Sequence, residues 1–148
     1  RRGRVRIQTA TQTRGKRQAG DFFNGLFQVL QSRKRSAKGL TELRLKGSSF
    51  RRCKTSARPK RRRGRATMPA QTSASRTIRR LGSSAKGRFR TRGRHSAATV
   101  RGTKWTTTDR CDGTLTKVTR GKVAVRDFRR RKTIIVKAGR SYLAKARR

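Results

Sequence analysis

The stretch TKVTRGKVAVRDF, residues 116–128, places valines and a terminal phenylalanine between lysines and arginines. Around Gly121 the apolar residues recur at nearly every second position, and a period of two puts alternate side chains on opposite faces of a β-strand. We therefore expect Val118, Val123, Val125 and Phe128 to form the inner row of strands, with the cations as the outer row. Arg120-Gly121 is expected to be the turn of a hairpin.

The charge of the chain is strongly one-sided. Among 148 residues, 46 are Lys or Arg and 5 are Asp or Glu, which gives a formal net charge of +41. Few of these cations can be paired within the chain, so self-repulsion opposes compaction and a polyanion is the natural partner. Hydrophobic residues make up 30%, enough for one domain or two small ones if they cluster. No window approaches 18 consecutive apolar residues, so no transmembrane helix is expected.

The same alternation extends outward from this stretch in both directions. Asn24-Gly25 is a strong hairpin signal. A β-bulge at Gly102 would return Trp105 to the face of Val100. The nearly continuous apolar run 132–139 favours a strand covered on both faces. Further strands are expected at residues 1–10, with Val5 and Ile7 on one face; at 26–30; at 39–47, with Thr41, Leu43 and Leu45 inward; at 87–93, with Phe89 and Thr91 inward; at 96–109; and at 140–144.

Two segments lack this pattern. Residues 11–20 are polar and indicate a loop, and residues 51–87 contain both prolines and the densest basic run, since nine of the fifteen residues 51–65 are Lys or Arg. We expect 51–87 to be a long basic loop with a helical turn at 77–81. The predicted fold is therefore all-β, an antiparallel β-sandwich or jelly roll, or a β-roll. It has N-terminal strands (1–50) on the same core as a C-terminal β-domain (88–148).

Cys53 and Cys111 are the two cysteines, and neither belongs to a Cys-x-x-Cys pair. With His95 as the single histidine, the chain offers too few ligands for a zinc site, so no metal is expected. The two thiols either form a disulfide or are independent buried groups. An unstrained disulfide across this separation would contribute about 3–4.5 kcal/mol and would indicate an oxidising compartment.

Three motifs in residues 96–144 resemble a known family. They are A-T-V-R-G-T (98–103), T-x-V-x-x-G-x-V-x-V (116–125) and V-x-A-G (136–139). Together they resemble the FecR-like domain, and the upstream part is similar to what precedes this domain in secreted, solo FecR-like proteins of actinobacteria. The resemblance implies an all-β, non-enzymatic, extracytoplasmic domain.

The chain has few side chains that could act as catalytic acids, bases or nucleophiles. Catalysis needs positioned acids, bases or nucleophiles, and this chain has five carboxylates and one imidazole. Asp109 and Asp112 are expected to form a turn and ion pairs, and His95 is expected to face solvent. We predict no enzyme, no catalytic residue and no cofactor.

A polyanion, either nucleic acid or an anionic cell-surface polymer, is the expected partner, since Lys and Arg give strong and salt-sensitive contacts with phosphate. The preferred interpretation is a secreted or cell-surface domain. The alternatives are a cytoplasmic ribosomal-type or nucleoid-type nucleic-acid-binding protein, and a filament or coat subunit that assembles with itself or a protein partner through sheet edges. The candidate contacts are Arg51, Arg52, Lys54, Lys60, Arg61, Arg62, Arg63, Arg65, Arg129, Arg130, Arg131 and Lys132.

Overall fold

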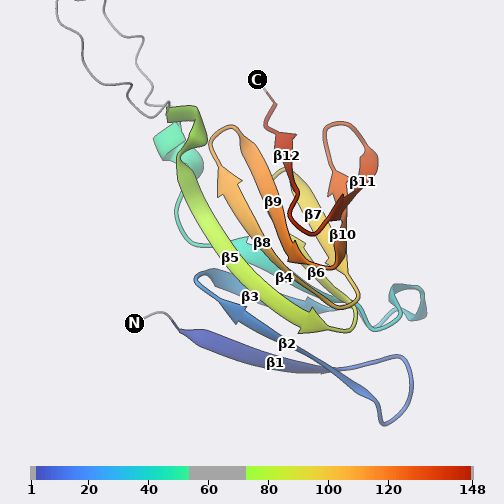
Figure 1. The fold of residues 1–148 in the computed structure, drawn as a ribbon. Coiled ribbons are helices and arrows are strands. Elements are labelled where there is room, and N and C mark those ends of the chain that lie inside the picture. The colour runs from blue at the N-terminus through green and yellow to red at the C-terminus, as the bar shows by residue number, and fades with distance from the viewer. Residues whose placement is uncertain (1–2, 54–72, 148) are drawn as a thin grey trace, which may run out of the picture.

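The structure, a computed structural model, describes residues 3–53 and 73–147. Two six-stranded sheets pack face to face as a β-sandwich (Figure 1). All strand pairs within the described residues are antiparallel except β4 and β6, which run parallel. The predicted all-β sandwich is therefore confirmed.

Each sheet mixes strands from both halves of the chain. The first sheet has the order β1 (Arg4–Ala10), β2 (Arg17–Phe23), β5 (Thr77–Lys86), β8 (Thr103–Arg110), β9 (Gly113–Arg120) and β12 (Ser141–Lys145). The second has the order β11 (Lys132–Lys137), β10 (Lys122–Asp127), β7 (Ser96–Val100), β6 (Phe89–Arg92), β4 (Thr41–Lys46) and β3 (Leu26–Gln31). Short 3₁₀ turns are η1 (Arg35–Ala37), η2 (Phe50–Cys53) and η3 (Ser73–Ser75).

The core lies between the sheets and contains the predicted valines. Val118, Val123 and Val125 are completely buried. Trp105 packs in the same cluster, and its indole N–H donates to Thr91 Oγ1 at 2.9 Å. Thr91 Oγ1 also lies 2.7 Å from Thr107 Oγ1. The core is therefore partly lined by hydroxyls: those of Thr91 and Thr107 bond to each other, whereas four other buried hydroxyls make no hydrogen bond within the described residues.

The expected hairpins at Asn24-Gly25 and Arg120-Gly121 are wrong, because in each case the flanking strands belong to different sheets. Asn24 and Gly121 have positive φ, +61° and +75°, which turns the chain sharply across the sandwich. Val118 on β9 and Val123 on β10 therefore face the core from opposite layers. Alternation predicts which side chains point inward, but it does not say which sheet a strand joins.

Gly102 also lies in a crossing between sheets, not in a bulge within one strand, because β7 ends at Val100 and β8 begins at Thr103. Val100 and Trp105 nevertheless share the core. Inward orientation is therefore predicted correctly here even though the local geometry is not.

β11 is an edge strand of the second sheet, so the prediction of a strand covered on both faces is wrong. Val136 faces the core, whereas Ile135 on the other face is 57% exposed. The end of β10 differs as well: Asp127 occupies the inward position and is 1% exposed, and Phe128 is only half-buried. The apolar residues of a short segment do not show whether its strand lies at the edge or in the middle of a sheet, or where the inward alternation ends.

Residues 77–86 form strand β5 in the middle of the first sheet, so the predicted helical turn at 77–81 is wrong and the predicted loop does not reach residue 87. The pairing of β5 with β8 is irregular between Thr77 and Arg79, and this shift obscures the period-two pattern. Likewise β2 begins at Arg17, inside the expected loop 11–20.

Over the described ranges 3–53 and 73–147, no helix has the length and apolar character needed to cross a membrane.

Candidate polyanion interface

Four arginines occupy the outer surface of the second sheet, and we call this set the arginine face: Arg44, Arg90, Arg92 and Arg126. Arg44 on β4 is the direct partner of Arg92 on β6, and Arg126 on β10 lies two strands beyond Arg92 in the same row, with Ala97 of β7 between them. Arg90 is paired with Thr99 in the neighbouring row. Because alternate residues of a strand share a face, the inward Leu43, Phe89 and Thr91 fix these arginines outward.

Glu42 organises three of these guanidinium groups. Its carboxylate lies 2.7 Å from Arg44 Nε, 3.5 Å from Arg90 Nη1 and 4.0 Å from Arg92 Nη1. Arg90 Nε also donates to Thr99 Oγ1 at 3.1 Å. Exposed ion pairs of this kind add little to stability. Their consequence is positional, because one negative charge holds three positive charges close together and leaves an excess of cation.

A pocket of about 320 Å³ adjoins the arginine face, and we call it the Phe50 pocket. Its lining is formed by β4, β5, η2, the end of β6 and the β6–β7 connection, and it contains five cations and no acid among the described residues. The lining residues are Arg44, Leu45, Lys46, Phe50, Arg79, Arg92, Gly93 and Arg94.

Phe50 supports two of these cations. The guanidinium carbon of Arg94 lies 4.4 Å from the ring centroid and that of Arg79 lies 4.9 Å from it. Arg79 is fixed further by donating from Nε to Ser48 O and from Nη1 to Leu45 O, each at 3.1 Å. The carbonyl acceptors orient the guanidinium, and the buried carboxylate of Asp109, 4.0 Å from Nη1, offsets part of its charge.

Asp109 anchors this region from the interior. It is completely buried at the end of β8 and accepts hydrogen bonds from the Thr114 hydroxyl at 2.6 Å and the Arg94 N–H at 2.9 Å. Its other oxygen lies 4.0 Å from Arg79 Nη1. A side chain at Gly93 would collide with Asp109 and Thr114. The predicted ion pair is therefore present, but Asp109 is a buried strand residue and not a turn residue.

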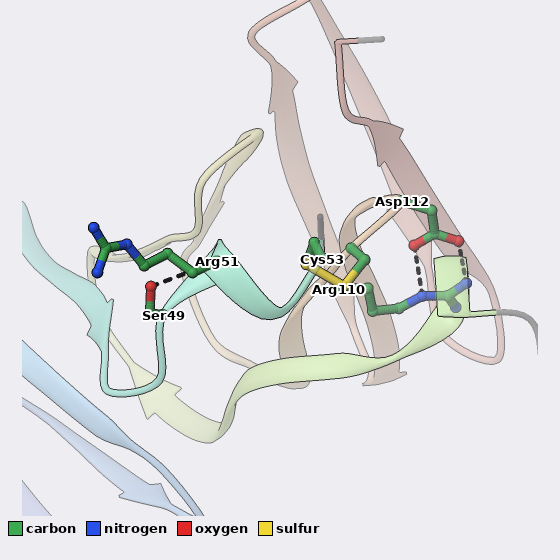
Figure 2. Close-up of a disulfide and its surroundings, with 6 residues drawn as sticks. Ser49, Arg51, Cys53, Arg110 and Asp112 are labelled. Carbon is green, nitrogen blue, oxygen red and sulfur yellow. Dashed lines mark hydrogen bonds and ion pairs between the residues drawn. A yellow bond between two sulfur atoms is a disulfide. The ribbon is translucent and has the colours of Figure 1, made fainter. Parts of the chain in front are cut away.

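The predicted disulfide joins Cys53 to Cys111 (Figure 2), with 5.3 Å between their Cα atoms. It connects η2, which carries Phe50, to the turn between β8 and β9. In that turn Asp112 pairs with Arg110, whose Nε donates at 2.8 Å and whose Nη2 makes a second contact. The prediction for Asp112 as a turn and ion-pair residue is thus confirmed, and the disulfide fixes the position of the Phe50 pocket.

Residues Arg129, Arg130, Arg131 and Lys132, all predicted contacts, lie at the tight connection between β10 and β11, and all are exposed. Asp127 shapes this turn by accepting the N–H groups of Arg129 and Arg130, each at 3.0 Å. The turn continues the arginine face, because Arg92 lies 5.0 Å from the ring centroid of Phe128.

The carboxylate of Asp127 is held by a third donor, the Tyr142 hydroxyl, at 2.7 Å. Burial by itself would raise the pKa of Asp127, but the hydrogen bonds from Arg130 N–H, Tyr142 and Arg129 N–H outweigh it and lower the pKa below its usual value. Burial and the hydrogen bond to Asp127 raise the pKa of Tyr142. The acid therefore stays ionised and keeps the basic turn in one shape.

The remaining predicted contacts fall in or beside the first basic run. Arg51 is exposed on η2, and its N–H donates to Ser49 Oγ at 3.2 Å (Figure 2). The backbone of Arg52 belongs to the same turn. Lys54, Lys60, Arg61, Arg62, Arg63 and Arg65 lie outside the described residues, so their part in the interface stays a prediction.

His95 differs from the expected solvent-facing residue, since it is half-buried with its ring edge-on to Phe50 at 6.5 Å. Burial, and then the charge of Arg94, lower the pKa of His95, so the imidazole is neutral near pH 7.

Sequence reasoning also missed Phe50 and the arginine face. The available signal was RFRTRGR (88–94), in which every second residue is an arginine on the face opposite Phe89.

Comparison with known proteins adds no relative: no family model, curated protein or solved structure matches the chain. Within the described residues, no group of three or more His, Cys, Asp or Glu side chains is placed to hold a metal ion. The resemblance to the FecR-like domain therefore stays a prediction from its three motifs.

Proposed function

We propose that this protein is a non-enzymatic, extracytoplasmic β-sandwich that binds an anionic polymer through the arginine face and the adjoining turn at residues 129–132. The observation that carries the proposal is the arrangement around Glu42, where one carboxylate gathers Arg44, Arg90 and Arg92 on the outer surface of the second sheet. Guanidinium groups pair in bidentate fashion with phosphate, sulfate and carboxylate groups. A row of them suits a polymer with repeated anionic groups.

The extracytoplasmic location rests on the disulfide between Cys53 and Cys111, because such bonds persist in oxidising compartments and are rare in the cytosol. The FecR-like motifs favour the same location. A cytoplasmic ribosomal-type or nucleoid-type protein would use the same cations on nucleic-acid phosphate. Two free thiols in protein purified from its natural source would favour that alternative.

The test compares binding to heparin, polyphosphate and random double-stranded DNA over a series of salt concentrations. The triple variant Arg44→Gln/Arg92→Gln/Arg126→Gln removes three charges from the arginine face. We expect its affinity to fall at least about tenfold, with a shallower dependence on salt, since fewer counterions are released.

The matched control is Lys104→Gln/Lys117→Gln/Arg120→Gln, which removes three exposed charges from the first sheet. Its affinity should fall much less, because a general loss of charge weakens binding mainly at long range. Equal losses in the two triple variants would show that binding is diffuse. Failure of all three polymers to bind at low salt would refute the proposed function.

A further inference from the structure

The Phe50 pocket differs from the open arginine face beside it. It is a shallow, solvent-open depression of about 320 Å³, wide enough for a small ligand group. Cations approach it from three directions: Arg44 and Lys46 on β4, Arg79 on β5, and Arg92 and Arg94 at the end of β6 and beyond it. Because these elements belong to both sheets, the hollow depends on the sandwich as a whole.

Two cations of this pocket, Arg79 and Arg94, are positioned before any ligand arrives. Arg79 is tied to two carbonyl oxygens and stacks on Phe50, and the backbone of Arg94 is tied to Asp109 while its guanidinium also contacts the Phe50 ring. Prior ordering of donors reduces the entropy lost on binding. The like charges of Arg79 and Arg94 around one ring favour an anion between or beside them.

From this arrangement we propose that the Phe50 pocket binds a single tetrahedral oxyanion, a phosphate or sulfate ester group of the polymer. This inference deepens the proposed function and rests on it. Arg94 and Arg92 supply donors from the open side, and Arg79 supplies charge from the floor. Phe50 acts as a positioning residue, because it contacts the guanidinium groups and not the anion.

The disulfide gives the pocket its fixed geometry. η2 has four residues, with Phe50 at its start and Cys53 at its end, and the bond to Cys111 ties its end to the β8–β9 turn. The same turn is held to the chain before β5 by hydrogen bonds from Cys111 N to Arg76 O at 3.1 Å and from Asp112 N to Ala74 O at 2.8 Å. The turn that carries Phe50 is therefore tied to the β8–β9 turn and, through it, to the chain that leads into β5.

The experiment is a titration of the full chain with inorganic phosphate and, separately, inorganic sulfate. Ionic strength is held constant with chloride, and the amide chemical shifts of Gly93 and Arg94 are followed. We expect saturable shifts at these amides. Arg94→Gln should weaken the affinity about tenfold, because it removes a charge-assisted donor. The matched control Arg101→Gln, an exposed arginine in the β7–β8 connection, should leave the affinity unchanged.

Phe50→Leu provides a second variant that keeps an apolar side chain but removes the aromatic face. It should also weaken phosphate binding. Arg79→Lys, which keeps the charge but loses the planar pair of donors, should weaken phosphate binding as well. A phosphodiester oligonucleotide and a heparin fragment, titrated separately against Arg94→Gln, distinguish phosphate from sulfate by which affinity falls.

Linear shifts without saturation, or equal affinity in wild type and Arg94→Gln, would overturn the inference. The proposed function has a different signature of failure. If polymer binding depends on the arginine face but inorganic oxyanions do not saturate, the inference alone falls. If no polymer binds, the proposed function falls and the inference falls with it.

Discussion

At the scale of single residues, Asp127 shows how a charged group is kept in a sandwich core. Three donors hold its carboxylate: two backbone N–H groups and the Tyr142 hydroxyl. Asp127→Asn should destabilise the fold by about 1–3 kcal/mol, since hydrogen bonds to a charged acceptor are stronger than those to a neutral one. Tyr142→Phe, which removes one donor of the three, should cost less. Urea denaturation followed by circular dichroism measures both.

The same residue gives a pH dependence with a defined sign. The pKa of Asp127 is lowered in the folded state from an ordinary value of 3.8. Its contribution to the free energy of unfolding is therefore complete above about pH 3.8 and is lost as pH falls through the folded pKa. In acid, wild type should lose stability more steeply than Asp127→Asn. Parallel curves for the two proteins would contradict the assignment.

At the scale of elements, neighbouring residues of β10 point to opposite faces of its sheet. Val123 is completely buried, and Ala124 lies on the outer side of the same strand. Val123→Asp should remove more than about 4 kcal/mol of stability, because it buries an unpaired carboxylate. Ala124→Asp, the matched control, should change stability by less than about 1 kcal/mol. Similar denaturation midpoints for the two variants would show that the strand faces are wrongly assigned.

Sequence patterning predicts the faces of these strands better than their partners. Leu43, Phe89 and Val125 were all predicted inward and all are buried. The crossings at Asn24-Gly25 and Gly121 were not predictable, because a tight turn within one sheet and a tight turn between sheets use the same residues with positive φ. The sheet order depends on contacts between distant parts of the chain, which local alternation does not encode.

The candidate site also has parts that the local sequence predicts and parts that depend on contacts between distant segments. The basic turn at 129–132 and the disulfide could be predicted, since each rests on composition or on simple chemistry. The Phe50 pocket could not be predicted. Its arginines come from three separate segments, and Glu42 and Phe50 gain their roles only when η2, β4 and β6 are brought together.

At the scale of the whole molecule, a net charge of +41 acts against a core built from few large side chains. Trp105, Phe22 and Phe89 are the largest fully buried residues, and small groups fill much of the remaining interior. Salt should therefore raise the melting temperature by screening repulsion between surface cations. A polyanion should add stability only to the extent that it binds the folded protein more tightly than the unfolded chain, which carries the same cations.

The most direct test of the central claim, that inward valines fold this chain beneath a cationic surface, is circular dichroism of the oxidised protein at about 0.15 M salt without any polyanion. We expect a β-rich spectrum and a cooperative thermal transition that moves to higher temperature as salt increases. A structureless or mainly helical spectrum under these conditions would contradict the account.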